Sequence, residues 1–454
     1  MHSLPSTAMR MTLAAISVFL AGEALAQSNH SQAESPIYDP TNATIFQMSA
    51  DPGQAFFMLN TVSLAKGGGS DVGEVFRIAT QIQPGNEDSV YSAFMPFADK
   101  IHTLAESIDP RIDPVGAREN YFHASTYYRS ASYYLVANPD DPPVALLQPP
   151  GEPFTVRAKN SSIGLYDVPA YFFKADASCD KPLPTIVIIT GYDASQQDEY
   201  HAQCIEGLRR GFNCVTLEGP GQPSPRRYQG LPFIPDYWTA LIPVIDNIVT
   251  RKDVDISKII LLGESFGGTL GAIAASHEPR LAGLICLDGL ASLQKVIASR
   301  IDPLLDLFES GNKTAFDQAV YEGLINNASQ PLSSRYYFQQ SLYTFKTKSP
   351  FDWFTQLGKI SMTIETVQGV GQRPVYVAKG QDDTLTGNAA DVALKMFQEE
   401  RPNGKNLTYF HEFTTDLGAG EHCSIGTETQ VWTSFAAWMH RTWGFKFSNV
   451  AYST

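Results

Sequence analysis

The sequence predicts an α/β fold, in which a doubly wound, mostly parallel sheet follows a helical domain and contains a helical insertion. From residue 153 onward, short apolar strands alternate with helical stretches, which is typical of βαβ units. The stretch 185–189, TIVII, is a continuous β-branched run and suits a strand buried on both faces of a parallel sheet. Helical patterns dominate 46–150 and 291–370, before and within this alternation.

The elements can be placed in chain order. Pro139, Pro142 and Pro143 end the first helical region, because proline cannot continue a helix. The insertion follows a strand at its carboxyl end, where a substrate-covering cap would sit; a purely structural helical layer is the alternative. We expect a signal peptide at 1–26, a flexible segment at 27–45, a helical N-terminal domain at 46–150, the first part of the sheet domain at 151–290, a helical cap at 291–370 and the second part of the sheet domain at 371–454. Strands are expected at 154–158, 162–166, 170–174, 185–189, 213–217, 258–262, 284–287 and 374–378.

Composition excludes several classes of protein. The 454 residues contain 47 Asp and Glu against 33 Lys and Arg, which gives a net charge of −14. We expect no nucleic-acid binding, because phosphate contacts need clustered basic side chains. A hydrophobic fraction of 43% allows a large core. No internal apolar run is long enough to predict a membrane span.

Residues 1–26 are organised like a cleavable secretory signal peptide. Arg10 supplies a positive charge, and the apolar stretch 12–22 is too short to span a bilayer. The small-x-small sequence 24–26 predicts cleavage after Ala26. The short apolar stretch disfavours a membrane anchor, and the single Arg disfavours a mitochondrial presequence. We therefore expect secretion or passage through the secretory pathway.

Several N-x-S/T triplets are compatible with that route. Each is weak evidence alone, because such triplets also arise by chance. The candidate glycosylation residues are Asn29, Asn42, Asn160, Asn312, Asn327 and Asn406.

The 5 cysteines do not form a dense disulfide framework, and their odd number leaves at least one thiol unpaired in a monomer. No cysteine or histidine cluster has zinc spacing. We expect neither a metal nor a cofactor.

The stretch 258–275 carries the most informative motif. A buried strand runs into GESFG at 263–267, and a small-residue helix follows at once. This is the nucleophile elbow of α/β hydrolases, in which only Gly fits beside the Ser. Ser265 is thereby placed at a helix N-terminus, where the dipole favours negative charge. Ser265 is the predicted nucleophile, and the backbone N–H of Phe266 is a predicted oxyanion donor.

The partners of Ser265 follow from chain order, which is Ser, then Asp or Glu, then His in this fold. Two adjacent carboxylates follow the strand at 374–378. The G-x-x-D pattern favours Asp383, and Asp382 is the alternative. Among the histidines beyond this turn, His411 lies in a strand pattern and His440 in the terminal helix. His422, in the small-residue loop 418–423, is the predicted base.

A second oxyanion donor is expected from the turn after the strand at 185–189. Gly191 allows the backbone to approach a substrate oxygen closely. We expect the backbone N–H of Tyr192 to be that donor.

Four strings together resemble a known family: GESFGG at 263–268, LEGPGQ at 217–222, TGYDAS at 190–195 and GAGEHC at 418–423. They resemble fungal α/β hydrolases of polyketide and pigment pathways, including heptaketide-shortening hydrolases and those of fusarin- and cytochalasan-type clusters. More distantly, the chain looks like the bacterial 2,6-dihydropseudooxynicotine hydrolase. GGGSDVGE at 67–74 and RSASYY at 129–134 resemble the helical part of that family, so the resemblance covers nearly all of 50–440.

The resemblance implies a hydrolase whose site lies between the sheet domain and the helical cap, with Ser265, Asp383 and His422 at the triad positions. It also implies cleavage of carbon–carbon bonds in β-diketone-like chains, or a part in ring formation. The signal peptide departs from the family pattern, because several relatives work inside the cell.

The leading functional interpretation is a serine hydrolase acting on a small-molecule carbonyl substrate of the polyketide type. A carboxylesterase or lactonase would use the same residues. A non-hydrolytic cyclase or dehydratase, or a catalytically dead binding protein, are further alternatives, although the intact triad argues against the last. The chain could act alone or as a homodimer.

Overall fold

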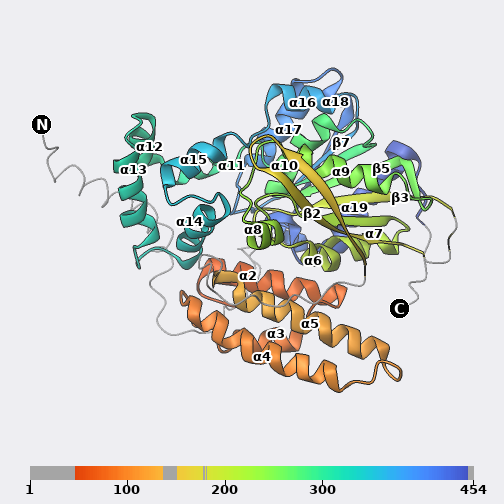
Figure 1. Cartoon of the computed structure of the whole chain (residues 1–454), viewed down its shortest axis with the longest axis horizontal. Helices are drawn as coiled ribbons and strands as arrows, with labels where there is room; N and C mark the ends of the chain where they lie inside the picture. Colours follow the sequence, from red (N-terminus) through yellow and green to blue (C-terminus); the bar gives the residue numbers. More distant parts are fainter. Residues whose placement is uncertain (1–45, 136–150, 177–178, 180, 448–454) are drawn as a thin grey trace, which may run out of the picture.

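A central eight-stranded sheet organises the molecule (Figure 1). The computed structural model describes residues 46–135, 151–176, 179 and 181–447. The sheet runs in the order β1-β2-β4-β3-β5-β6-β7-β8, with parallel pairing from β4 to β8 and antiparallel pairing of β2 with both β1 and β4. The strands are β1 (Glu152–Asn160), β2 (Gly164–Phe173), β3 (Leu183–Ile189), β4 (Asn213–Leu217), β5 (Val254–Glu264), β6 (Gly283–Leu287), β7 (Val375–Gly380) and β8 (Thr408–Phe413). The predicted α/β-hydrolase fold with a mostly parallel sheet is confirmed.

The two strands expected at 162–166 and 170–174 are one strand, β2. It pairs with the whole length of β1, from Phe172 opposite Glu152 to Gly164 opposite Asn160. Pro169 is tolerated inside it, because pairing with β4 begins only at Ala170. The remaining expected strands are present with ends that differ by a few residues.

Both faces of the parallel strands are buried, and each faces its own core. Along β3, Val187 and Ile189 point into one core, whereas Ile186 and Ile188 point into the other. Helices α9 (Trp238–Ile248) and α10 (Phe266–His277) contribute to the first core, and α7 (Ile205–Arg209) and α19 (Glu428–Trp443) to the second. This arrangement explains the continuous apolar runs of the sequence. The other helices of the sheet region are α6 (Gln196–Glu199), α8 (Pro223–Gln229), α17 (Ala389–Glu399) and α18 (Gly404–Leu407).

A separate group of helices precedes the sheet and lies beside it, drawn in orange in Figure 1. It comprises α2 (Pro52–Ser63), α3 (Val72–Ala79), α4 (Glu87–Ser107) and α5 (Pro114–Ser132). Its side chains form a third core around Phe94 and Tyr127.

The insertion between β6 and β7 is helical, as expected. It comprises α11 (Leu293–Arg300), α12 (Asp302–Glu309), α13 (Lys313–Val320), α14 (Leu332–Thr344), α15 (Pro350–Gly358) and α16 (Ile364–Val370). Leu332 and Tyr336 of α14 are part of the third core, so α14 packs against the N-terminal helices. At the other end of the insertion, α16 packs against α10. The insertion therefore joins both halves of the molecule.

Several predictions fall on residues outside the described ranges. These are the signal peptide at 1–26, the segment 27–45, the glycosylation residues Asn29 and Asn42, and the prolines near the boundary at residue 150. None of the helices in the described residues has the length and apolarity needed to cross a membrane.

Candidate active site

Ser265 lies in a sharp turn between β5 and α10. Its backbone has a positive φ of 53° with ψ −125°, an unusual conformation for a residue with a side chain. A Cβ on Gly263 would lie 2.3 Å from the Gly267 carbonyl oxygen, and one on Gly267 would lie 2.4 Å from the Ile189 oxygen. A side chain at Gly263 or Gly267 would therefore collide with the neighbouring backbone. The N–H of Ser265 donates to the Leu287 carbonyl at 2.8 Å, which ties the turn to the end of β6.

The turn after β3 lies against Ser265. A Cβ on Gly191 would be 3.3 Å from the Ser265 Cβ. Gln222 fixes this turn, because its side-chain amide donates to the Thr190 carbonyl at 3.1 Å and to the Thr190 hydroxyl at 2.7 Å. Among the described residues, the N–H groups of Tyr192 and Phe266 have no hydrogen-bond acceptor. Two backbone N–H groups without an acceptor among the described residues thus lie at or beside the Ser265 turn.

The structure brings His422 to Asp383 and leaves Asp382 apart. His422 follows β8 in the loop before α19, and its Nδ1 lies 2.7 Å from Asp383 Oδ2, with both side chains buried. Asp383 also accepts the N–H groups of Leu385 at 2.8 Å and Thr386 at 2.9 Å, and the Thr386 hydroxyl. Asp382 is exposed and accepts the Thr415 hydroxyl. Of the two adjacent aspartates, Asp383 contacts His422, whereas Asp382 contacts Thr415.

The buried pair is electrostatically coupled. Burial opposes ionisation of Asp383, but the neighbouring charge of His422 and the hydrogen bonds lower the pKa of the carboxyl to about 2. Burial likewise opposes the charge of His422, yet Asp383, and after it Asp288 and Glu264, raise the pKa of the ring to about 9. The site therefore strongly favours an ion pair.

Ser265 and His422 border the same strand end. Ser265 is tied to Leu287, and Asp288 is the next residue along the chain. One ligand atom each of Asp288, His422 and Cys423 lies within 4.8 Å of the others. Ser265 Oγ and His422 do not hydrogen-bond to each other in this structure, a separation often seen in enzymes without substrate.

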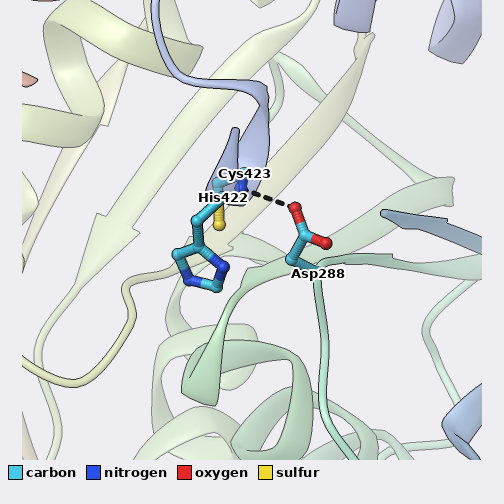
Figure 2. Close-up of side chains that lie close together, drawn as sticks. All are labelled: Asp288, His422 and Cys423. Atoms are coloured by element: carbon cyan, nitrogen blue, oxygen red, sulfur yellow. Dashed lines mark hydrogen bonds between the residues drawn. The ribbon is translucent and has the colours of Figure 1, made fainter. Parts of the chain in front are cut away.

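Figure 2 shows Asp288, His422 and Cys423 together. Together these three side chains offer atoms that could bind a cation, but the ligand atoms already take part in other interactions. Asp288 accepts N–H groups from Gly380 and Cys423. Burial raises the pKa of the Cys423 thiol well above its usual range, which disfavours the thiolate that a metal needs. These contacts indicate that Asp288 holds the loop of His422 by hydrogen bonds, rather than that the three residues bind a metal.

Sequence reasoning missed Asp288, although a signal existed. It directly follows the buried strand 284–287, at the carboxyl edge of the sheet at which the turn with Asp382 and Asp383 follows a later strand. It also missed Glu264, the variable residue before Ser265 in the motif. Burial raises the pKa of Glu264 to about 7, and its carboxylate accepts the Gln203 side-chain amide.

The glycosylation residues in the described ranges differ in access. Asn312 and Asn406 are exposed, and Asn327 is half-buried. Asn160 is only 3% exposed, and its amide donates to Asp236 at 3.1 Å. Of the four sites, Asn160 is therefore the one whose side chain is inaccessible in the folded chain, so glycosylation there stays a prediction that this burial disfavours. None of the cysteines, all within the described residues, is in a disulfide.

Comparison with known proteins identifies relatives of this chain. The α/β hydrolase psoB of Aspergillus fumigatus is 28% identical over 292 residues, which cover 59% of this chain and 65% of that protein, so the match spans just under two thirds of the relative. The 20-hydroxy-prefusarin hydrolase FUS2 of Gibberella moniliformis is 24% identical over 83% of this chain and 93% of its own. The predicted resemblance to fungal α/β hydrolases of secondary-metabolite pathways is confirmed.

The crystal structure of 2,6-dihydroxy-pseudo-oxynicotine hydrolase has the same fold. It superimposes with a TM-score of 0.60 at 18% identity, covering 86% of this chain and 98% of its own. Residues 180–417, just over half of the chain, match the family described as serine aminopeptidase, S33. The chain belongs to this family of α/β hydrolases.

Proposed function

We propose that this chain is a serine hydrolase in which Ser265 is the nucleophile, His422 the general base and Asp383 the carboxylate that orients it. One observation carries the proposal: a strained strand–helix turn at Ser265 and a buried His422–Asp383 hydrogen bond lie at the same edge of the sheet. A Ser hydroxyl is a weak nucleophile until a base accepts its proton, and the base needs an orienting carboxylate.

In the proposed reaction, Ser265 Oγ attacks a substrate carbonyl carbon while His422 Nε2 accepts the hydroxyl proton. The electron pair of the C=O bond moves to oxygen, where the N–H groups of Phe266 and Tyr192 stabilise it. The bond to the leaving group then breaks, and His422 gives the proton to that group. Water, deprotonated by His422, finally releases the acyl group as a carboxylic acid and restores Ser265.

We propose that the scissile bond is a carbon–carbon or related carbonyl linkage of a polyketide-like small molecule. A carbon leaving group between two carbonyls departs as an enolate, which His422 can protonate. The printed name of one relative, a 20-hydroxy-prefusarin hydrolase, supports small-molecule chemistry of this kind. A carboxylesterase, a lactonase or a non-hydrolytic cyclase would use the same groups.

The surroundings of Tyr192 support a flat, oxygenated substrate. Its ring stacks on Phe233 at 5.5 Å and on Tyr337 at 5.6 Å. On α14, the Tyr337 hydroxyl and the Gln340 side-chain oxygen are buried without a hydrogen-bond partner among the described residues. Burying such groups is unfavourable unless something satisfies them, so a bound ligand with carbonyl and hydroxyl groups would gain from these contacts.

The experiment that tests the reaction class is a comparison of substrates. Purified protein is offered β-diketone polyketides and matched aryl esters, with kcat/KM and products measured for each. We expect diketone cleavage that Ser265→Ala removes. Turnover of esters alone would indicate an esterase instead. A product whose mass shows that no water has been incorporated would indicate a cyclase.

We also propose that the chain enters the secretory pathway and is cleaved after Ala26. The proposal depends on the sequence of 1–26 and on the exposed sites Asn312 and Asn406. N-terminal sequencing of protein from its native host should begin at Gln27. An intact Met1 without any glycan mass would contradict it.

A further inference from the structure

Asp288 is a buried carboxylate at the end of β6 to which the proposed triad assigns no role. Its side chain is fully buried, and its backbone is left-handed, with φ 47°. Its own N–H donates to the Ala378 carbonyl of β7 at 2.8 Å. The backbone therefore fixes where this carboxylate points, and it points toward the His422 loop (Figure 2).

The carboxylate joins two other parts of the chain. It accepts the Gly380 N–H at 3.0 Å, and it accepts the Cys423 N–H at 2.5 Å. Cys423 immediately follows His422. One side chain thus connects the ends of β6 and β7 to the loop that carries the proposed base.

That loop needs outside support. Cys423 and Ser424 are both left-handed, with φ 56° and 50°. Non-glycine residues seldom adopt this conformation, and two in succession persist only where neighbouring groups hold them. The loop also packs closely on β7, since a Cβ on Gly380 would lie 2.3 Å from the Glu421 carbonyl oxygen.

Asp288 also faces the His422 ring electrostatically. The charged groups around the ring come from four places: Asp383 after β7, Asp288 after β6, Glu264 at the end of β5, and Glu421 in the loop itself. Asp383 holds Nδ1 directly. Burial raises the pKa of the Asp288 carboxyl to about 7, so above that pH it adds negative charge within 4.8 Å of the ring without bonding to it.

We propose that Asp288 is a positioning residue for His422: it fixes the loop through the Cys423 N–H and stabilises the imidazolium that forms when Ser265 loses its proton. This inference rests on the proposed function of His422 as the base. The two contributions are separable, because Asn removes the charge while its single oxygen can still accept the Cys423 N–H. The thermal midpoint reports any loss of stability at the Gly380 N–H, which would then face the Asn amide nitrogen.

The test compares Asp288→Asn with a matched control, Glu218→Gln. Glu218 is equally buried at the end of β4 and accepts two N–H groups, from Gln196 at 2.9 Å and Ser224 at 2.8 Å. Because the substrate is unidentified, the readout is the rate of labelling by a fluorophosphonate probe as a function of pH. The thermal midpoint of each variant is measured alongside.

We expect Asp288→Asn to slow labelling by about 10- to 100-fold and to move the rise in rate to lower pH, since the ring loses a stabilising charge. Glu218→Gln should lower the thermal midpoint without moving the profile. A wild-type rate with an unmoved profile in Asp288→Asn would overturn the proposal. So would a slower rate whose profile stays unmoved, because that pattern indicates a merely structural role.

A second measurement does not depend on activity. The His422 ring is titrated by NMR in Ser265→Ala, with and without Asp288→Asn, and we expect a lower midpoint in the double variant. An equal midpoint contradicts the inference, whereas retained activity in Ser265→Ala contradicts only the proposed function. Asp288→Ser, which keeps an acceptor without charge, replaces Asp288→Asn if the latter fails to fold.

Discussion

The carboxyl edge of the sheet and the helical layer around α14 and α15 satisfy their buried polar groups differently. At the sheet edge, Asp288 and Asp383 each receive at least two backbone N–H groups. In the layer, buried side-chain atoms without a partner among the described residues are concentrated: Gln330, Arg335, Tyr336, Tyr337, Gln340 and Trp353 contribute six of the nine. Native proteins keep few such atoms. At the sheet edge, backbone N–H groups of the fold satisfy the carboxylates of the proposed site. In the helical layer, buried polar atoms stay available to hydrogen-bond a ligand.

The largest effect should come from the sheet edge. Ser265→Ala removes the proposed nucleophile, so turnover should fall by about 10⁴-fold or more, with the thermal midpoint close to that of the parent protein. Labelling by a fluorophosphonate probe should disappear. The double variant Ser265→Ala/His422→Ala should be little worse than either single variant, because these residues act as a unit. Full activity in Ser265→Ala would place the chemistry elsewhere.

The next effect separates two adjacent residues at the same edge. Asp383→Asn keeps the shape but presents a different hydrogen-bond pattern to His422, so we expect kcat to fall by about 10³- to 10⁴-fold. Asp382→Asn changes only an exposed side chain held by Thr415, and its kcat should stay within about twofold. Steady-state kinetics on both variants decides the matter, and the reverse ranking would move the acid to Asp382.

A pH profile sharpens the same region. The base must be unprotonated to accept the Ser265 proton, and the site raises the pKa of His422 to about 9. The unprotonated fraction therefore grows as the pH rises toward that value. We expect kcat/KM to increase from neutral pH to about pH 9, measured with one substrate in buffers of constant ionic strength. A profile that is flat above neutral pH would mean that His422 is not held as this ion pair.

The smallest effect should come from the helical layer, and its sign differs. Tyr337→Phe removes a buried hydroxyl that has no hydrogen-bond partner among the described residues, so the protein without substrate should gain up to about 1 kcal/mol of unfolding free energy. KM should rise if a ligand normally bonds to that hydroxyl. The control is Tyr166→Phe, whose hydroxyl is 2.7 Å from Thr239 Oγ1. It should lose stability and leave KM unchanged. Equal changes in unfolding free energy and KM in both variants would mean that the helical layer does not differ from the rest of the fold in this respect.

The sheet edge was also the region that the sequence made predictable. Strand 213–217 and the turn at Ser265 are encoded by local patterns, a β-branched or apolar run and a motif of fixed spacing. The choice of His422 followed from chain order and loop composition. The turn at Asp382 and Asp383 could be located, but which carboxylate reaches His422 depends on how a loop 39 residues away docks.

The helical layer resisted prediction for a physical reason. Helical periodicity shows that 291–370 folds into helices, but not what their faces contact. Tyr336 of α14 stacks on Tyr133 at 4.9 Å, a contact across some two hundred residues that no local pattern encodes. Burial at Asn160 was missed for the same reason, because Asp236 lies 76 residues away. The first contact belongs to the third core, and the second joins the end of β1 to the segment before α9, so each forms only when distant parts of the chain have packed together.

The hydrogen bond from Cys423 to Asp288 determines when the proposed site can form during synthesis of the chain. Its partners are 135 residues apart, and the acceptor is synthesised first. Until the segment after β8 has emerged and docked, Asp288 lacks one of its partners, and His422 has no fixed position. Domains fold in the course of synthesis, so the sheet can begin to form while the chain is still chemically inert. Hydrolytic competence, with Ser265 and His422 acting as proposed, arrives only when the segment after β8 has docked.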